Sequence, residues 1–130
     1  MKKAAEQGDV DAQYNLGVAY ERGVGVAKDV LLAFEWMNKA ARQGYPEAQD
    51  NLGLYYAMGE GVEKNPALAF TWFQIAAEAS GFDKAQYNLG FCYATGLGVE
   101  TDLEQAIAWF ERAAAKGNAN AQAALEKLRG

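Results

Sequence analysis

The chain has 130 residues, of which 51% are hydrophobic and 22% are charged, with a formal net charge of −5. This composition allows a packed core, and no apolar run approaches the roughly 20 residues that span a bilayer, so neither a disordered tail nor membrane insertion is expected. The net negative charge disfavours nucleic acid as a partner. The chain has no histidine, and Cys92 is its only cysteine, so we expect no enzyme, no cofactor, no metal and no internal disulfide.

The first predicted element is a partial repeat over residues 1–11. Its segment Lys3-Ala4-Ala5-Glu6-Gln7-Gly8 matches residues 39–44, which close a helix further along the chain. The start also lacks the apolar stretch of a signal peptide. We therefore expect a piece of a longer array, or a designed module, with an open N-terminal end through which the protein could self-associate.

Three full repeats follow, over residues 12–47, 48–84 and 85–120. The segment Ala-Gln-x-Asn-Leu-Gly begins each one, at intervals of 36 and 37 residues. The additional residue of the longer interval lies in segment 78–80, where a loop is expected. A fixed period of this length is the sequence signature of a helical repeat array.

Each repeat predicts two helices. The first runs from about residue 10 to 22, with apolar residues at helical spacing, and a glycine at 23, 59 or 96 ends it in a left-handed conformation. The second begins at the N-caps Asp29, Asn65 and Asp102 and ends near residue 43, 79 or 116. Glycine in the middle of each first helix, at 17, 53 and 90, predicts close approach of a neighbouring helix.

Residues 121–130 predict a capping helix. They begin like another first helix, but Glu126 stands where the repeats have glycine and Arg129 where they have tyrosine. These polar residues block a further helix from docking, as a terminal repeat requires.

The pattern Ala-x-x-x-Leu-Gly-x-x-Tyr-x-x-Gly-x-Gly-Val, followed by Asp or Asn, Ala, Trp and Ala-Ala-x-x-Gly, resembles the Sel-one-like repeat family, which is related to the tetratricopeptide repeat. The resemblance covers nearly the whole chain. It implies one all-α domain, a solenoid of stacked antiparallel hairpins forming a superhelix with the first helices on the concave face. It also implies adaptor roles in signalling, in quality control of membrane complexes or, in bacteria, in host interaction.

A partner protein or peptide is expected where the repeats differ, because positions that repeat unchanged serve the fold. Such positions form a stripe at i, i+4 and i+8 on each first helix, and stacking would join the stripes into a partly apolar groove. By similarity to tetratricopeptide domains, we predict that partner contacts are made by Tyr14, Val18, Arg22, Asp50, Leu54, Met58, Tyr87, Phe91 and Thr95.

Structural interpretations compete at several of these positions. Val18, Leu54 and Phe91 could instead pack against the next first helix, whereas Tyr14, Arg22, Asp50 and Met58 are the stronger candidates for exposure. Repeated side chains favour structural roles. The asparagines at 15, 51 and 88 and the glutamines at 13, 49 and 86 would bond to nearby backbone, and the tryptophans at 36, 72 and 109 would lie in the core. The glycine pairs predict turns and no phosphate site. Arg22 and Lys84 are the basic residues expected near the groove.

Two other functions remain open. One is a structural or designed solenoid without a natural ligand. The other is an enzyme that binds or hydrolyses β-lactams, since one branch of the family has been linked to these compounds and some bacterial members carry a disulfide in every repeat. Cys92 has no possible partner and there is no Ser-x-x-Lys motif, so the sequence departs from that branch. A cytoplasmic or periplasmic location would fit a bacterial protein.

Overall fold

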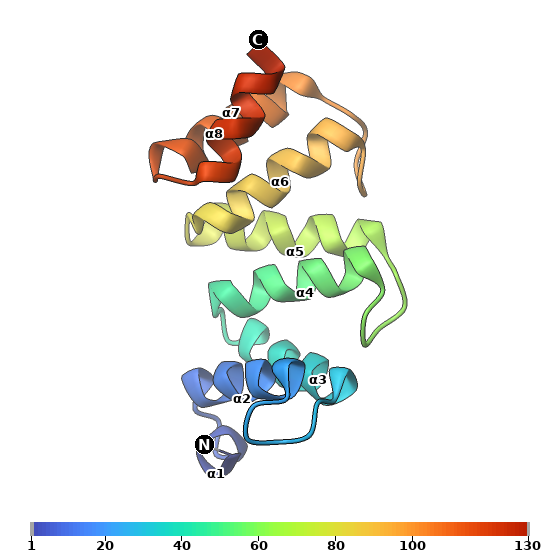
Figure 1. Ribbon diagram of the computed structural model, residues 1–130, viewed down its shortest axis with the longest axis vertical. Helices are drawn as coiled ribbons and strands as arrows, with labels where there is room; N and C mark the ends of the chain where they lie inside the picture. The colour runs from blue at the N-terminus through green and yellow to red at the C-terminus, as the bar shows by residue number, and fades with distance from the viewer. Residues whose placement is uncertain (1, 130) are drawn as a thin grey trace. The chain divides into compact units, whose positions relative to one another are not determined.

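The computed structural model describes residues 2–129, and these form eight helices and no strand (Figure 1). The helices gather into two compact units, which we call unit 1 (residues 1–65) and unit 2 (residues 66–130). Unit 1 contains α1 (Lys2–Glu6), α2 (Val10–Arg22), α3 (Val30–Arg42) and α4 (Pro46–Met58). Unit 2 contains α5 (Pro66–Ala79), α6 (Asp83–Thr95), α7 (Leu103–Ala115) and α8 (Ala119–Arg129).

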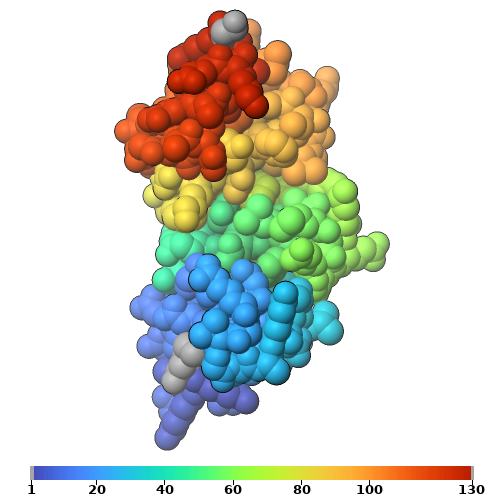
Figure 2. Space-filling view, in the orientation of Figure 1, coloured from blue at the N-terminus to red at the C-terminus, as the bar shows by residue number. Residues whose placement is uncertain are grey.

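Within each unit, every helix packs against the next one in the chain. In unit 1 the order is α1, α2, α3 and α4, and in unit 2 it is α5, α6, α7 and α8, so each unit is a series of helical hairpins. In the space-filling view, side chains close the spaces that the ribbon leaves between neighbouring helices of a unit (Figure 2). The all-α fold of helix-turn-helix repeats is confirmed.

The second helices begin where the N-cap residues predict. Asp29 accepts a hydrogen bond from the backbone N–H of Leu32 at 3.1 Å, and Asp102 accepts one from Gln105 at the same distance. Each cap satisfies an N–H group that has no partner inside its helix. Pro66 is the first residue of α5, a position that needs no N–H donor.

Glycine ends the first helices, as predicted. Gly23, Gly59 and Gly96 have φ values of 71°, 71° and 80°, in the left-handed region that side chains disfavour. The N–H of Gly23 returns to the carbonyl of Ala19 at 2.7 Å, and the other two glycines make the equivalent bond. The glycine pairs are therefore turns between two helices.

The mid-helix glycines lie against the second helix of their own hairpin in both cases that the structure details. A Cβ on Gly17 would lie 3.1 Å from the methyl carbon of Met37. A Cβ on Gly90 would lie only 2.7 Å from two ring carbons of Phe110. Gly53 is buried as well. The predicted close approach is confirmed for α2 with α3 and for α6 with α7.

Two of the three tryptophans occupy the core. Trp36 is 8% exposed and Trp109 is 6% exposed, and a cation lies 4.4 Å from the ring centre of each, Lys39 and Arg112 respectively. Trp72 is only partly buried, so the core prediction is too strong there.

The buried glutamines bond to backbone, as expected from their repetition. The side-chain amides of Gln13 and Gln49 each donate to a carbonyl eight residues earlier, Ala5 and Ala41, at 3.2 Å. Each bond ties a first helix to the helix before it. The structural role predicted for these two glutamines is confirmed.

Candidate partner-binding site

In unit 1, the predicted groove positions include two well-exposed side chains. Met58, the last residue of α4, is 58% exposed, a high value for a large apolar side chain, and Arg22 at the end of α2 is also exposed. Val18 and Leu54 are half-buried. Each of these two side chains is therefore partly packed inside unit 1 and keeps part of its surface exposed.

The expected exposure of Asp50 and Tyr14 is wrong. Asp50 is 4% exposed, so its carboxylate belongs to the buried polar groups of the fold and offers a partner almost no surface. Tyr14 is half-buried because its ring stacks on Tyr45, which precedes α4, with ring centres 5.0 Å apart. Sequence spacing placed both residues on the correct helix but did not reveal what would cover them.

In unit 2, the three predicted positions lie along α6. Phe91 is 45% exposed, so its side chain is divided between a packed part and a surface that a partner could reach. Tyr87 is half-buried, with its ring centre 5.6 Å from that of Phe110. Thr95 is exposed, and its hydroxyl donates to the carbonyl of Phe91 at 2.8 Å. Phe91 and Thr95 are thus the accessible residues among the three predicted positions of α6.

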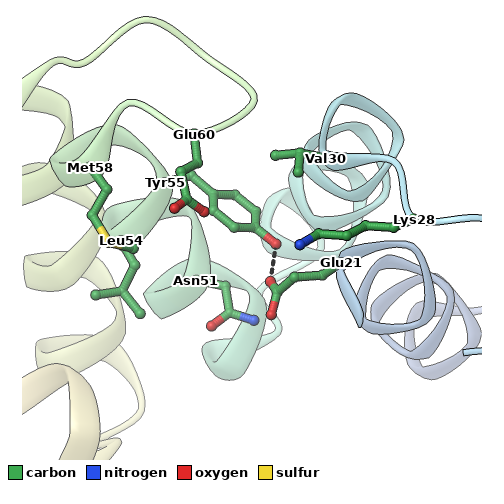
Figure 3. Close-up of a pocket in the computed structure, with 8 residues that line it drawn as sticks. All are labelled: Glu21, Lys28, Val30, Asn51, Leu54, Tyr55, Met58 and Glu60. Carbon is green, nitrogen blue, oxygen red and sulfur yellow. Dashed lines mark hydrogen bonds between the residues drawn. The ribbon is translucent and has the colours of Figure 1, made fainter. Parts of the chain in front are cut away.

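A cavity of about 280 Å³ lies in unit 1 between α2, α4 and the loops that follow them (Figure 3). Two of its residues, Leu54 and Met58, were predicted as partner contacts. Arg22 and Lys84 were the basic residues expected near the groove, yet Lys28 is the one that lines this cavity. The complete lining is Glu21, Lys28, Val30, Asn51, Leu54, Tyr55, Met58 and Glu60.

The interior of the cavity is organised by a hydrogen bond between the two first helices. The hydroxyl of Tyr55 on α4 donates to the carboxylate of Glu21 on α2, and the ammonium group of Lys28 points toward the same place (Figure 3). Burial, the bond to Glu21 and the nearby charge of Glu60 raise the pKa of Tyr55 above its usual value. Tyr55 is therefore a neutral donor in the physiological pH range.

Asn51 combines a packing role with a position in the cavity wall. Its amide nitrogen donates to the sulfur of Met37 at 3.7 Å, so Asn51 makes a structural contact, but with a side chain and not with the backbone expected for the repeated asparagines. The same side chain lines the cavity beside Leu54. A repeated residue can therefore contribute to a site that its equivalents in other repeats do not form.

Comparing the repeats position by position could have indicated this cavity. Glu21 corresponds to alanine at 57 and 94, and Tyr55 corresponds to Ala19 and Cys92. Glu60 corresponds to Val24 and Leu97. The combination of two carboxylates with a tyrosine hydroxyl occurs once in the chain. The analysis of one stripe per helix missed it because these residues lie outside that stripe.

A reactive thiol, a metal centre and a membrane-spanning helix are other features to look for in residues 2–129. Cys92 is free and buried, and burial raises the pKa of its thiol to about 12. In the part of the chain that the structure describes, no group of three or more acidic or cysteine side chains could hold a metal ion. None of the helices over residues 2–129 combines the length and the apolar character that crossing a membrane requires.

Comparison with known proteins agrees with the repeat pattern. The profile of a family described as the Sel1 repeat matches residues 1–9, 10–45, 46–80 and 83–118. The matched segments follow the helical hairpins and cover most of the chain. A search of curated protein sequences gave no significant match.

Solved structures resemble the chain closely. A Sel1 repeat protein from Oxalobacter formigenes is 43% identical with a TM-score of 0.87, covering 97% of this chain and 94% of its own. The protective antigen c5321 of uropathogenic Escherichia coli strains, which displays an SLR fold, is 44% identical over 90% of this chain, with a TM-score of 0.87, but only 25% of its own length is matched. Cysteine-rich protein B of Helicobacter pylori shares the fold at 24% identity, with a TM-score of 0.75, over 95% of this chain and 93% of its own.

Proposed function

Because the chain belongs to the Sel1 repeat family, whose members are generally scaffolds for protein interaction, we propose that it binds a partner protein or peptide on the surface of its first helices. These helices are α2, α4 and α6. Proteins of the family are typically non-catalytic, and we propose the same for this one. Binding would then be its whole biochemical activity.

The exposure of large apolar side chains where the repeats differ is the observation that supports this proposal best. Met58 on α4 and Phe91 on α6 are 58% and 45% exposed, and they occupy two of the predicted stripes. Methionine and aromatic side chains suit partner recognition because they bury much apolar area on binding. Partner contacts also remain predicted for the surrounding positions Tyr14, Val18, Arg22, Tyr87 and Thr95. Asp50 is buried, so it would influence binding only through its charge and not through direct contact.

The alternative of a purely structural solenoid accounts less well for these residues. Exposed apolar side chains alone do not decide between the two functions, since Leu31 and Leu103 on the second helices are 66% and 52% exposed. The stripe positions instead differ from repeat to repeat: Val18, Leu54 and Phe91 occupy one position, and Arg22, Met58 and Thr95 another. Such variation fits recognition of a particular partner.

Affinity capture from cells that produce the protein tests the proposal. A variant carrying Leu54→Glu, Met58→Glu and Phe91→Glu should lose the captured proteins while its circular dichroism remains that of a helical protein. The matched control carries Leu31→Glu, Ile75→Glu and Leu103→Glu, three exposed apolar positions on the second helices. It should capture what the wild type captures.

Two outcomes would contradict the proposal. The first is a folded groove variant that still retains the same proteins, since the first helices would then not be the binding surface. The second is equal loss in the groove variant and in the control, since added negative charge anywhere would then explain the effect.

A further inference from the structure

We propose that the cavity between α2 and α4 receives a single arginine side chain from the bound partner. This inference rests on the proposed binding function and specifies one contact of it. The occupant follows from three features of the cavity: its volume, the division of its wall into apolar and acidic parts, and its net negative charge.

The volume fits one side chain. Pockets for small-molecule ligands usually hold about 300–1,000 Å³. This cavity is open to the surface and holds about 280 Å³, which is at the lower end of that range and large enough for one long side chain. The volume of the cavity therefore agrees with one protruding side chain of a partner.

The wall combines an apolar side with an acidic one. Leu54 and Met58 lie on α4, and Glu21 lies across the cavity on α2 (Figure 3). Glu60 contributes a second carboxylate from the loop after α4. An arginine has an apolar stem that packs against methionine and leucine, and a guanidinium group that donates in pairs to a carboxylate.

The existing hydrogen bond leaves Glu21 able to accept more. A carboxylate has two oxygens and about four acceptor sites, and Tyr55 occupies one oxygen of Glu21. Glu60 is exposed and makes no ion pair with a lysine or arginine within the described residues. Two carboxylates therefore face the cavity with unused acceptor capacity.

Lys28 is the one cation in the wall, and it reduces the negative charge of the cavity. It lies in the exposed loop before α3, and over residues 2–129 it forms no ion pair with Glu21 or Glu60. Its ammonium group points toward Glu21 in Figure 3. A long, unpaired lysine can move into water, so we infer that Lys28 occupies the acidic end until an arginine displaces it.

The local charge identifies the occupant as cationic. Two carboxylates against one lysine leave the cavity with a net negative charge, and the whole chain carries −5. An acidic side chain would meet repulsion from both glutamates, and an apolar one would leave their remaining acceptor sites unused. Arginine is favoured over lysine because its planar donor group can contact both carboxylates at once.

A peptide titration followed by NMR tests the inference. The probe is an acetylated, amidated tripeptide with arginine between two leucines, and the comparison peptides carry citrulline, lysine or glutamate in the middle. The arginine peptide should shift the methyl signals of Leu54 and Met58 in a saturable manner. The chain has only three methionines, so the Met58 signal is readily assigned. Citrulline has the same shape without charge and should bind roughly ten-fold more weakly.

Three variants make the test specific. Glu21→Gln with Glu60→Gln should weaken the arginine peptide roughly ten-fold, and the glutamine can still accept from Tyr55. The matched control, Glu35→Gln with Glu63→Gln, removes the same charge from exposed positions outside the cavity and should leave affinity unchanged. Lys28→Met should tighten binding several-fold because it removes the internal competitor.

Some results would overturn the inference without touching the proposed function. Equal shifts from the arginine and citrulline peptides would refute charge recognition, and preference for the glutamate peptide with loss of binding in Lys28→Met would show that the cavity takes an anion. If no peptide shifts these methyl groups, the cavity takes no such side chain. The scaffold function is judged separately, by whether the groove variant still captures partners.

Discussion

Replacing Gly90 by alanine should destabilise the protein, although alanine is the better helix former. Gly90 lies in the middle of α6, where its Cα faces α7. The added methyl group would lie 2.7 Å from two ring carbons of Phe110 and 3.2 Å from the carbonyl oxygen of Ala106. Carbon atoms at optimal contact are about 3.5–4.0 Å apart, so the ring or the helix must move.

The magnitude follows from two opposing terms. Alanine gains about 1 kcal/mol over glycine in a helix interior, whereas overpacking a core costs typically 1–3 kcal/mol and sometimes more. Phe110 is 3% exposed, and its ring also stacks with Tyr87, so it cannot turn aside freely. The backbone of Ala106 adds a second, less yielding contact. We expect Gly90→Ala to lower the free energy of unfolding by about 1–2 kcal/mol.

Gly17→Ala provides the internal comparison at the same position of an earlier repeat. Its methyl group would meet the side chain of Met37 at 3.1–3.2 Å. Methionine is flexible and can shift by the few tenths of an ångström required. Here the gain in helix propensity should offset the contact, and Gly17→Ala should change the free energy of unfolding by less than about 0.5 kcal/mol.

Urea unfolding followed by circular dichroism measures both variants. The double variant Gly90→Ala with Phe110→Leu completes a mutant cycle, and it should recover part of the loss, with a coupling energy of about 0.5–3 kcal/mol between the two sites. Equal stabilities of the Gly90→Ala and Gly17→Ala variants, or strict additivity in the cycle, would refute the argument that the phenyl ring causes the strain.

Three further predictions concern the core and its polar contacts. Trp36→Ala should lower the free energy of unfolding in urea by about 3–5 kcal/mol. Trp72→Ala should lower it clearly less, because Trp72 is only partly buried, and equal losses would contradict this difference in burial. Burial raises the pKa of the Cys92 thiol to about 12, so this thiol should resist a thiol reagent in the native protein. The free energy of unfolding should fall as the pH rises above 9.0, the ordinary pKa of the thiol, because only the unfolded thiol ionises there. Cys92→Ala should reduce that fall, and an unchanged alkaline profile would exclude ionisation of Cys92 as its cause. Gln43 donates to Gln13 at 2.8 Å, whereas in the later repeat Lys116 stands in place of Gln43 and the Oε1 atom of the equivalent Gln86 has no partner among the described residues. Lys116→Gln should supply that donor and stabilise the protein by about 1 kcal/mol in urea unfolding. The reverse change, Gln43→Lys, should destabilise it.

The repeat pattern predicted most of the fold because it depends on local rules. Side-chain capping sets the helix starts at Asp29 and Asp102, and the left-handed φ that glycine tolerates sets the helix ends at Gly23, Gly59 and Gly96. Both effects depend on residues close by in the sequence. Close helix contact at Gly17 and Gly90 was also predictable, because an unfavourable residue repeats at one register. The partial exposure of Trp72 was not, since burial depends on surroundings that one repeat does not contain.

The candidate site was less predictable because it depends on pairs of residues far apart in the sequence. Tyr55 and Glu21 are 34 positions apart, and their bond requires the actual register of α2 against α4. Lys28 lies in a loop whose course no periodicity fixes. Periodicity gave the stripe that contains Leu54 and Met58, whereas the acidic half of the cavity lay outside it.

Asp50 shows that variation among repeats does not by itself identify a binding position. It replaces a tyrosine found in the other two repeats and is nevertheless 4% exposed. Phe91 and Met58 vary as well, but their exposed apolar surface gives a partner something to bury. Glu21 varies and contacts Tyr55 of the next repeat, so its carboxylate is held in place before any partner arrives. A binding position in this fold therefore needs variation together with either exposure or a fixed orientation toward a cavity, and Met58 and Glu21 meet these two conditions on opposite sides of the same cavity.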